Sequence, residues 1–531
     1  MKKKLILLVS LITIVLVNAQ AQNTFWLGTN YKGAFPVTDG TPATDWTDEW
    51  TNFDPENANY PQTTTTISAD ITSNTTLSGV VLLQNKVYVK NNSTLTILPG
   101  TIIRGDYTTQ GTLIITKGSK IIAEGTKTWP IVFTSNEDIG NRAEGDWGGL
   151  VILGQALNNQ PGGIANIEGI VVSSDTEYGG TNDADNSGSL KYVRVEFAGI
   201  ALEPNKEING VTFGSVGSGT QVDYVQVSFS GDDSFEWFGG TVNCKHLIAY
   251  RGIDDDFDTD FGYRGNVQFA LSIRDNNMYD AAGASNVFES DNDATGSSNT
   301  PQTAAVFSNV TMVGPRGNGL YILPVGEKFE KAFQIRRNSS LSVFNSLIVG
   351  WEKGLSVEGT PVETNITNGT AVFSHNVLLE IPQTCVTATS GFYSTFFGQN
   401  SNDSTSTILQ TNWVNIFTQL GVKPDARLNS GSVVAVGADF THPKFGGVTQ
   451  FESLYENQNT DVNVRFFPNP TSNFLNVIGS GNFSIMIYDN LGNVVINKNV
   501  SNNTELDMSN FAKGVYTVLV NNRVSNKIIL Q

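Results

Sequence analysis

The sequence predicts an all-β chain: a right-handed parallel β-helix, in which successive coils stack into a solenoid, followed by a small C-terminal β-sandwich. Three observations predict it. Short apolar runs are separated by Gly, Asn, Asp and Ser, without the sustained 3.6-residue periodicity of helices. Strand-like segments in the middle of the chain recur at a step of 22 residues, a length typical of one coil. Roughly the last 70 residues instead form apolar-alternating runs between tight-turn sequences, as antiparallel strands do.

Residues 1–21 are predicted to be a signal peptide. Lys2 to Lys4 precede a short apolar stretch from Leu5 to Val17, and Ala19-Gln20-Ala21 supplies the small residues of a cleavage site between Ala21 and Gln22. This stretch is too short to anchor the chain in a membrane, and no later stretch approaches a spanning length. We therefore expect a mature protein that lies outside the cell and is not a transmembrane protein.

Residues 22–72 are predicted to form an N-terminal cap. The open end of a solenoid is an exposed strand edge that has to be covered, and this segment is rich in large aromatic side chains. They are Phe25, Trp26, Tyr31, Phe35, Trp46, Trp50 and Phe53. A platform that stacks on sugar rings is the alternative for the same residues. Trp147 and Trp237, which lie later in the sequence, have the same two interpretations: packing in the core or stacking on a sugar ring.

Residues 73–381 are predicted to form the β-helix. Tyr224, His246 and Gln268 occupy equivalent places in three strand-like segments and follow each other at steps of 22, so we expect them to stand in one column. A coil cannot bury its apolar side chains alone, so coils stack at about 4.8 Å per coil into one continuous core. Roughly 300 residues would give about ten to thirteen coils.

Two acidic segments keep this step of 22, and the sequence predicts that they converge. The eight carboxylates are Asp232, Asp233, Glu236, Asp254, Asp255, Asp256, Asp258 and Asp260, and Glu289, Asp291 and Asp293 extend the series. Crowded carboxylates repel each other and raise their own pKa values. A hard cation with six to eight oxygen ligands resolves this conflict, so Ca²⁺ is the candidate cofactor. The alternative is a set of solvated turns whose side chains accept hydrogen bonds from nearby backbone N–H groups.

The same acidic segments allow a catalytic interpretation as well as a binding one. β-Helix polysaccharide lyases combine Ca²⁺, held by acidic residues, with an Arg or Lys base, which makes Arg251, Arg264 and Arg274, together with Asp255, weak catalytic candidates. Paired carboxylates are also what a glycoside hydrolase needs. The Gly-His-Gly and Arg-x-Lys signatures of polygalacturonase-type hydrolases are absent, and so are nucleophile-elbow, zinc-helix and Walker motifs. The sequence therefore favours binding over catalysis.

The net charge and the number of cysteines limit the classes of partner and the disulfide bonds that the chain can have. The net charge of −18 becomes −21 once the three leader lysines are removed, so nucleic acid, which requires clustered Lys and Arg, is excluded as a partner. Cys244 and Cys385 are the two cysteines, too few for a disulfide scaffold. A single bridge between them and a simply buried Cys244 both remain open.

The C-terminal part divides into three segments. Residues 382–455 are predicted to be a C-terminal cap region with a short helix around 411–420, and residues 456–463 a polar linker. In residues 464–531 a set of turn and strand residues occurs in a fixed order: Pro468, Asn469, Pro470, Tyr488, Asp489, Gly492, Gly514, Tyr516 and Lys527. This order resembles the type A C-terminal sorting domain of the Bacteroidetes type IX secretion system. The resemblance implies the secretion machinery as a partner, export through the outer membrane, and release or surface anchoring after the tag is removed.

The rest of the chain resembles a family of bacterial surface and secreted β-helix proteins. The matching segments are Trp46 to Pro55, Gly145 to Leu150, Asp232 to Gly240 and Asp254 to Gly265. This resemblance implies the fold but no agreed activity. We therefore expect a secreted or surface-displayed β-helix protein that binds or adheres to an extracellular glycan or surface. The alternative is a Ca²⁺-dependent polysaccharide lyase or glycoside hydrolase.

Overall fold

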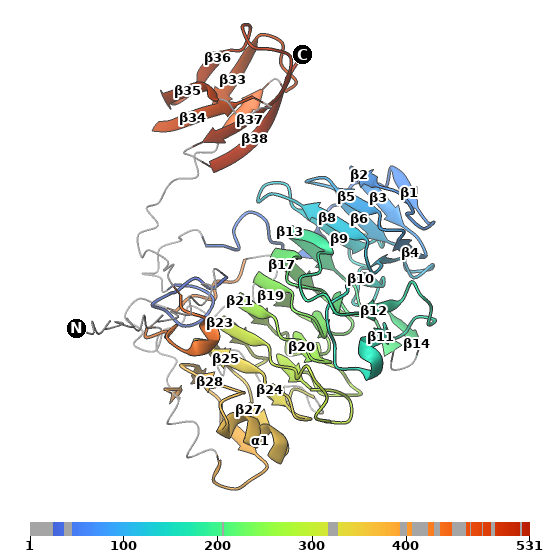
Figure 1. The fold of residues 1–531 in the computed structure, drawn as a ribbon, viewed down its shortest axis with the longest axis vertical. Coiled ribbons are helices and arrows are strands. Elements are labelled where there is room, and N and C mark those ends of the chain that lie inside the picture. Colours follow the sequence, from blue (N-terminus) through green and yellow to red (C-terminus); the bar gives the residue numbers. More distant parts are fainter. Residues whose placement is uncertain are drawn as a thin grey trace, which may run out of the picture. The chain divides into compact units, whose positions relative to one another are not determined.

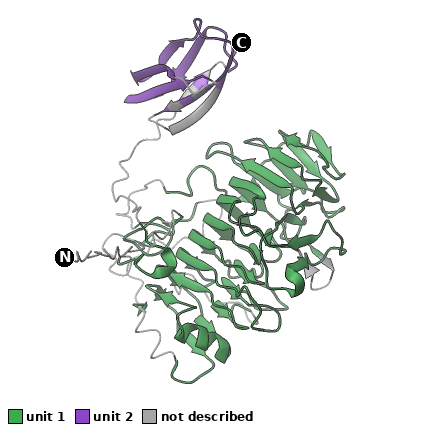
Figure 2. Cartoon of the chain, in the orientation of Figure 1, with its two compact units in different colours: residues 1–450 green, residues 451–531 purple. Residues whose placement is uncertain are grey.

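The computed structural model divides the chain into two compact units, residues 1–450 and 451–531, which are described separately (Figure 2). The structure describes residues 25–36, 45–203, 206–316, 326, 328–392, 401–405, 423–428, 436–448, 464–467, 469–479, 482–489, 494–520 and 523–531. The predicted signal peptide, the linker and the expected helix around 411–420 lie outside these residues.

The first unit is a parallel β-helix, which confirms the predicted fold class (Figure 1). One sheet has ten parallel strands, one for each coil: β4 (Lys86–Val89), β7 (Thr112–Ile115), β10 (Gly149–Leu153), β16 (Val211–Gly214), β18 (Phe235–Phe238), β20 (Phe257–Asp260), β22 (Phe288–Ser290), β24 (Lys331–Ile335), β27 (Lys353–Val357) and β30 (Gln383–Thr387). Their inward residues join the other sheet in one continuous apolar core.

The other sheet has 17 strands. They are β1 (Thr65–Ile67), β2 (Thr75–Leu77), β3 (Val80–Leu83), β5 (Thr94–Ile97), β6 (Ile102–Gly105), β8 (Lys120–Glu124), β9 (Ile131–Ser135), β13 (Gly188–Glu196), β17 (Gln221–Ser228), β19 (Asn243–Tyr250), β21 (Asn266–Ile273), β23 (Val306–Val313), β25 (Ser342–Phe344), β26 (Leu347–Val349), β28 (Phe373–Ser374), β29 (Val377–Leu379) and β31 (Asp403–Thr405). Parallel strands therefore begin before and end after the predicted limits of 73–381.

The remaining elements of this unit are short. Two hairpins, β11 (Ile164–Asn166) with β12 (Glu177–Gly179) and β14 (Ala201–Glu203) with β15 (Lys206–Glu207), extend from the coils. The helices are α1 (Thr360–Thr367) and the 3₁₀ turns η1 (Pro55–Asn57), η2 (Pro161–Gly163) and η6 (Pro443–Phe445). Among the helices of the described chain, none has the length and apolar character needed to cross a membrane.

A column of aromatic side chains marks the bend in the long strands. Tyr192, Tyr224, His246 and Phe269 have φ angles of 49°, 56°, 50° and 60°, and each interrupts the ladder pairing of its strand. Their rings stack in sequence, with centroids 4.5 Å, 4.2 Å and 5.2 Å apart. This stacking between coils compensates part of the cost of a left-handed conformation in bulky residues.

The predicted column is correct for Tyr224 and His246 but wrong for Gln268. Gln268 pairs with Lys245, and Phe269 lies opposite His246, so this step is 23 residues long. The extra residue lies between β20 and β21, where Phe261–Gly265 replaces the shorter connection that follows β18. The Gln268 side chain instead exchanges hydrogen bonds with the backbone of Leu27.

The N-terminal aromatic segment lies along the side of the solenoid. The sequence had instead predicted that it covers the open end. Its backbone is held by Gln226 of β17, Gln268 of β21 and Asn309 of β23, which belong to three different coils. Trp26 and Trp50 are buried, at 1% and 0% exposure. Polar side chains on the outer face of the strands make this possible, because they replace the hydrogen bonds that an extended segment would make to water.

Replacement of Asn309 by Ala is expected to loosen this segment. The Asn309 amide is fully buried and donates to Thr29 Oγ1, Tyr31 O and Gly33 O at 3.0–3.2 Å. Its loss leaves buried acceptors unsatisfied, at a cost of about 1–3 kcal/mol. Hydrogen exchange of residues 25–36 measures the effect, with the exposed Asn277→Ala as control. Unchanged protection of residues 25–36 would contradict this assignment.

Trp147 and Trp237 are core residues, which removes the sugar-stacking alternative for both. Each is 0% exposed. Trp147 stacks on Phe133 and donates to the carbonyl of Glu196 at 2.8 Å, and Trp237 stacks on Phe213 and Tyr263. A Cβ at Gly105 would lie 2.5 Å from Trp147, so the glycine makes room for the indole. Cys244 is buried, Cys385 is half-buried, and both are free thiols.

The second unit consists of two small antiparallel sheets, as the sequence predicted. One sheet has β32 (Arg465–Phe467), β33 (Phe474–Ile478) and β36 (Thr504–Asp507); the other has β34 (Asn482–Tyr488), β35 (Val494–Ser501), β37 (Gly514–Val520) and β38 (Arg523–Leu530). Tyr488 ends β34, and Gly514 begins β37, where the Tyr516 hydroxyl donates to Ala512 O at 2.5 Å. Pro468 and Gly492 lie outside the described residues.

Candidate metal centre

A ladder of acidic side chains follows the outer face of the ten-stranded sheet. Phe235, Phe257 and Phe288 point inward and are fully buried in the core. The next residue in each strand points to the opposite face because side chains alternate along a strand. Parallel pairing places these residues, Glu236, Asp258 and Glu289, in register on β18, β20 and β22. The predicted register of the two acidic segments is thereby confirmed.

The turns that precede β18 and β20 add further carboxylates at one end of this ladder. Asp232, Asp233 and Asp254 bring carboxylate oxygens within 4.8 Å of one another. Asp233, Glu236 and Asp258 form a second group by the same criterion. Asp233 belongs to both groups, so the two groups join into one cluster of five carboxylates, which we call the carboxylate cluster.

The carboxylate cluster is poorly compensated within the protein. Burial, followed by the repulsion of neighbouring carboxylates, holds the pKa values of Asp233, Glu236, Asp254 and Asp258 well above their usual range. Asp258 Oδ1 is buried without a hydrogen-bond partner. Asp233 Oδ1 accepts from the Asp255 N–H at 2.8 Å. Several convergent anionic oxygens with one unsatisfied atom fit a hard cation, so the cluster can hold a metal ion.

The other three residues of the predicted set serve different contacts. Asp255 Oδ1 accepts from the Asn286 N–H at 2.6 Å, and Asp260 Oδ1 accepts from the Phe261 N–H at 2.6 Å. Asp256 points to the interior, where its Oδ2 lies 3.2 Å from Arg274 Nε and both side chains are 0% exposed. Burial raises the pKa of Asp256 to about 6, although Arg274 lowers it. The structure thus brings together five of the eight predicted ligands.

The three predicted arginines are engaged in structural contacts. Arg274 donates to the carbonyls of Gly252, Asp254 and Asn286. Arg264 pairs with Asp183 at 2.5 Å and is hydrogen-bonded to nearby carbonyls. Arg251 lies 3.4 Å from Asp275.

Two arginines that sequence reasoning missed lie at the other end of the ladder. Arg336 pairs with Glu289 and, at 2.9 Å, with Asp291, while Arg337 Nη1 lies 2.6 Å from Asp291. Burial and Asp255 raise the pKa of Glu289, and Arg336 limits this rise, so that its value is about 8. These arginines follow β24 directly, which is the one sequence signal that could have identified them. At the Glu289 end of the ladder, arginines therefore balance the carboxylate charges. At the other end, the described residues include no such basic partner for Asp233.

The electrostatics of the cluster predict how stability depends on pH without divalent cations. Folded-state pKa values above the unfolded values mean that the folded chain holds extra protons, so its stability falls as pH rises from about 4 through the folded-state pKa values. We expect the melting temperature in chelator to be at least about 5 °C lower at pH 8 than at pH 5. The variant Asp258→Asn, which removes one of these charges, should show a smaller decrease. A melting temperature that rises over this range would contradict the prediction.

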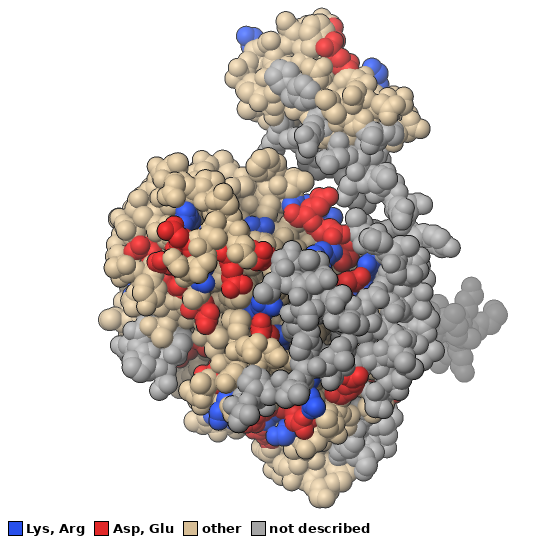
Figure 3. All heavy atoms as spheres, turned by 180° about the vertical axis from the view of Figure 1, so that it is seen from behind, with Lys and Arg blue, Asp and Glu red and all other residues tan. Residues whose placement is uncertain are grey.

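Acidic and basic side chains are mixed on the face of the molecule that Figure 3 draws. On the described part of the face drawn in Figure 3, basic side chains lie among acidic ones and form no extended patch.

Comparison with protein families identifies both units. Residues 66–418 match the model of a pectate-lyase like beta helix domain, and residues 465–531 match that of a secretion system C-terminal sorting domain. No curated protein matches the chain. The sorting domain confirms the predicted export route, so the protein is exported through the type IX secretion system to the cell surface or the medium.

Proposed function

Because the chain belongs to the family of pectate-lyase like β-helix domains, we propose that it is a secreted glycan-binding protein whose carboxylate cluster binds Ca²⁺ and, through it, sugar hydroxyl groups. The observation that carries this proposal is the pair of carboxylate groups that share Asp233. Ca²⁺ accepts six to eight oxygen ligands, and five carboxylates leave room for oxygens of a bound sugar.

The charge of the cluster supports a neutral glycan as the ligand. Five carboxylates carry more negative charge than one divalent cation cancels, so an occupied cluster remains anionic or retains protons. Like charges repel, so hydroxyl oxygens of a neutral sugar are better additional ligands than the carboxylates of a uronic acid. We therefore expect neutral polysaccharides to bind more tightly at this site than polyuronates.

The state of the arginines supports binding without turnover. A lyase base has to release its proton near neutral pH and reach the sugar ring. Arg274 is fully buried, and Arg264 and Arg251 pair with Asp183 and Asp275. Burial lowers the pKa of Arg336, but Glu289 and Asp291 outweigh this effect and raise it, so Arg336 keeps its proton.

The alternative is a Ca²⁺-dependent polysaccharide-degrading enzyme, with which the family match is equally consistent. Paired carboxylates such as Asp233 and Glu236 would then serve as acid and base, or the cluster would hold Ca²⁺ against a uronate substrate. This alternative requires turnover of a polysaccharide, whereas the binding proposal does not.

A glycan array and two activity assays separate these functions. Wild-type protein is applied with Ca²⁺ or with chelator, and release of reducing ends and of unsaturated uronates is measured in parallel. Binding that is lost in chelator and in Asp233→Asn, without turnover, supports the proposal. The exposed Glu49→Gln is the control, because it removes a carboxylate outside the cluster. Turnover that disappears in Asp233→Asn would establish the enzyme instead.

A further inference from the structure

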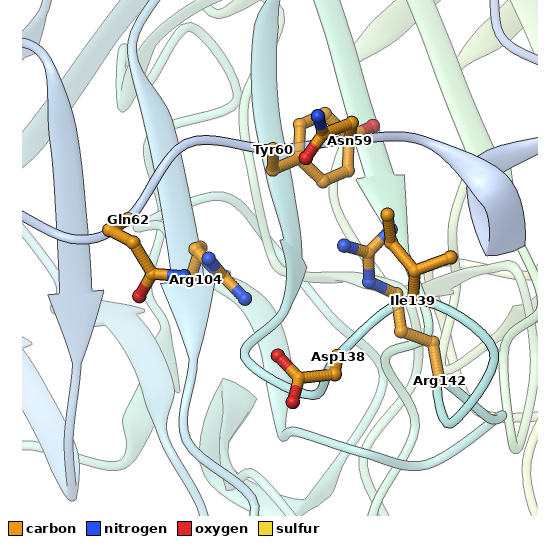
Figure 4. Close-up of a pocket in the computed structure, with 7 residues that line it drawn as sticks. All are labelled: Asn59, Tyr60, Gln62, Arg104, Asp138, Ile139 and Arg142. Atoms are coloured by element: carbon orange, nitrogen blue, oxygen red, sulfur yellow. The ribbon is translucent and has the colours of Figure 1, made fainter.

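A polar pocket lies at the first coils of the solenoid, and the carboxylate cluster contributes no residue to it (Figure 4). It has a volume of about 270 Å³ and is lined by residues of three segments: the extended chain around Tyr60, strand β6, and the loop that follows β9. Arg104 comes from β6 and Arg142 from the loop. Figure 4 shows their side chains on two sides of the same space, with Asp138 between them.

Both arginines are buried cations without a carboxylate partner. Arg104 is 4% and Arg142 7% exposed. Their donors reach backbone carbonyls instead: Arg104 Nη1 donates to Pro61 O at 3.1 Å, and Arg142 Nη1 donates to Pro55 O and Ala58 O at 2.8 Å. Arg142 also lies over the Tyr60 ring, 4.9 Å from its centroid. Carbonyl groups satisfy hydrogen bonds but do not neutralise the two charges.

This situation differs from that of the other arginines whose side chains the structure describes. Each of those has a carboxylate oxygen within 4.0 Å; they are Arg194, Arg251, Arg264, Arg274, Arg316, Arg336, Arg337 and Arg427. Burial and the charge of Arg142 lower the pKa of Arg104, and the charge of Asp138 raises it only in part. Arg104 Nε is buried and has no hydrogen-bond partner. In so acidic a protein, two adjacent buried cations without a carboxylate at ion-pair distance mark a place for an anion.

We propose that this pocket binds an oxyanion, either a sulfate or carboxylate group on a sugar or the free inorganic anion. A planar guanidinium presents paired N–H donors that match two oxygens of such a group. The amide side chains of Asn59 and Gln62 also line the pocket and provide partners for hydroxyl groups of an attached sugar ring. The pocket shares no residue with the carboxylate cluster, so the proposal does not depend on Ca²⁺ binding there.

Asp138 provides a test that loss of folding cannot imitate. It is the acidic residue among those that line the pocket, and it is exposed. Its charge opposes an incoming anion, so Asp138→Asn is expected to tighten binding by about threefold to tenfold. Asp138→Lys should tighten it further.

Calorimetric titration of the full chain with inorganic sulfate, a sulfated monosaccharide and galacturonate tests the proposal. Wild-type protein should bind at least one of them, more weakly as NaCl increases, and Arg104→Gln and Arg142→Gln should each weaken binding at least tenfold. Arg337→Gln, on the acidic ladder, is the matched control and should bind normally. If the arginine variants unfold, the increase in anion affinity expected for Asp138→Asn decides the outcome.

Gln62→Ala distinguishes the two sources of the anion. Weaker binding of the charged sugar, with unchanged binding of inorganic sulfate, identifies a sugar ligand; equal effects on both identify the free oxyanion. Absence of binding by the wild-type protein, or an affinity unchanged by Asp138→Asn, would overturn the proposal.

Discussion

Calcium is expected to raise the melting temperature of the wild-type chain at pH 8 by about 5 °C, and Asp233→Asn is expected to remove most of this rise. A ligand that binds only the folded state at one hundred times its Kd stabilises it by about 2.7 kcal/mol. For a unit of this size, that free energy corresponds to several degrees. Asp233 belongs to both carboxylate groups, so its replacement weakens both. Differential scanning calorimetry with Ca²⁺ and with chelator measures the effect.

Replacement of Asp233 by Asn separates loss of cation binding from loss of folding. Asn keeps the side-chain oxygen that accepts from the Asp255 N–H, and it removes a charge that burial and Asp232 make unfavourable. In chelator at pH 8, Asp233→Asn should therefore melt at or above the temperature of the wild-type chain. Glu49→Gln should retain the full response to Ca²⁺. The cation assignment fails if Ca²⁺ leaves the wild-type melting temperature unchanged or if Asp233→Asn responds normally.

The convergence of the carboxylate cluster could be predicted because two neighbouring coils have equal length. Between β18 and β20 each residue lies opposite the one 22 positions later, so Glu236 meets Asp258. The predicted spacing of 22 residues is wrong at Gln268, because one added residue shifts the register there. Arg336 lies beyond longer loops, 47 residues after Glu289, and no fixed step connects the two. Periodicity therefore predicts contacts between coils of equal length and fails where a loop of unknown length intervenes.

The sequence predicted which segments lie next to each other better than it predicted the directions in which their side chains point. Three consecutive aspartates, 254–256, all belonged to the predicted ligand set, but a turn that enters a strand points them to different places. Asp254 joins the cluster, while Asp256 enters the core and meets Arg274. The N-terminal segment shows a second limit, because its contacts with Gln268 and Asn309 join residues more than 200 positions apart. Aromatic composition predicted that the segment packs, but it could not identify the surface.

Removal of the buried cation in Arg274→Met is expected to destabilise the β-helix by about 3–5 kcal/mol, because it leaves Asp256 charged and unpaired in the core. The free energy of unfolding in urea measures this loss. The loss should be smaller at pH 5 than at pH 8, since Asp256 already has a pKa of about 6 with Arg274 present and takes up a proton more readily without it. The double variant Arg274→Met/Asp256→Asn should recover part of the stability, and Arg337→Gln, whose side chain is 42% exposed, should lose less than about 1 kcal/mol. A catalytic Arg274 would instead lose activity at unchanged stability, so an Arg274→Met protein as stable as the wild-type chain would contradict the structural role.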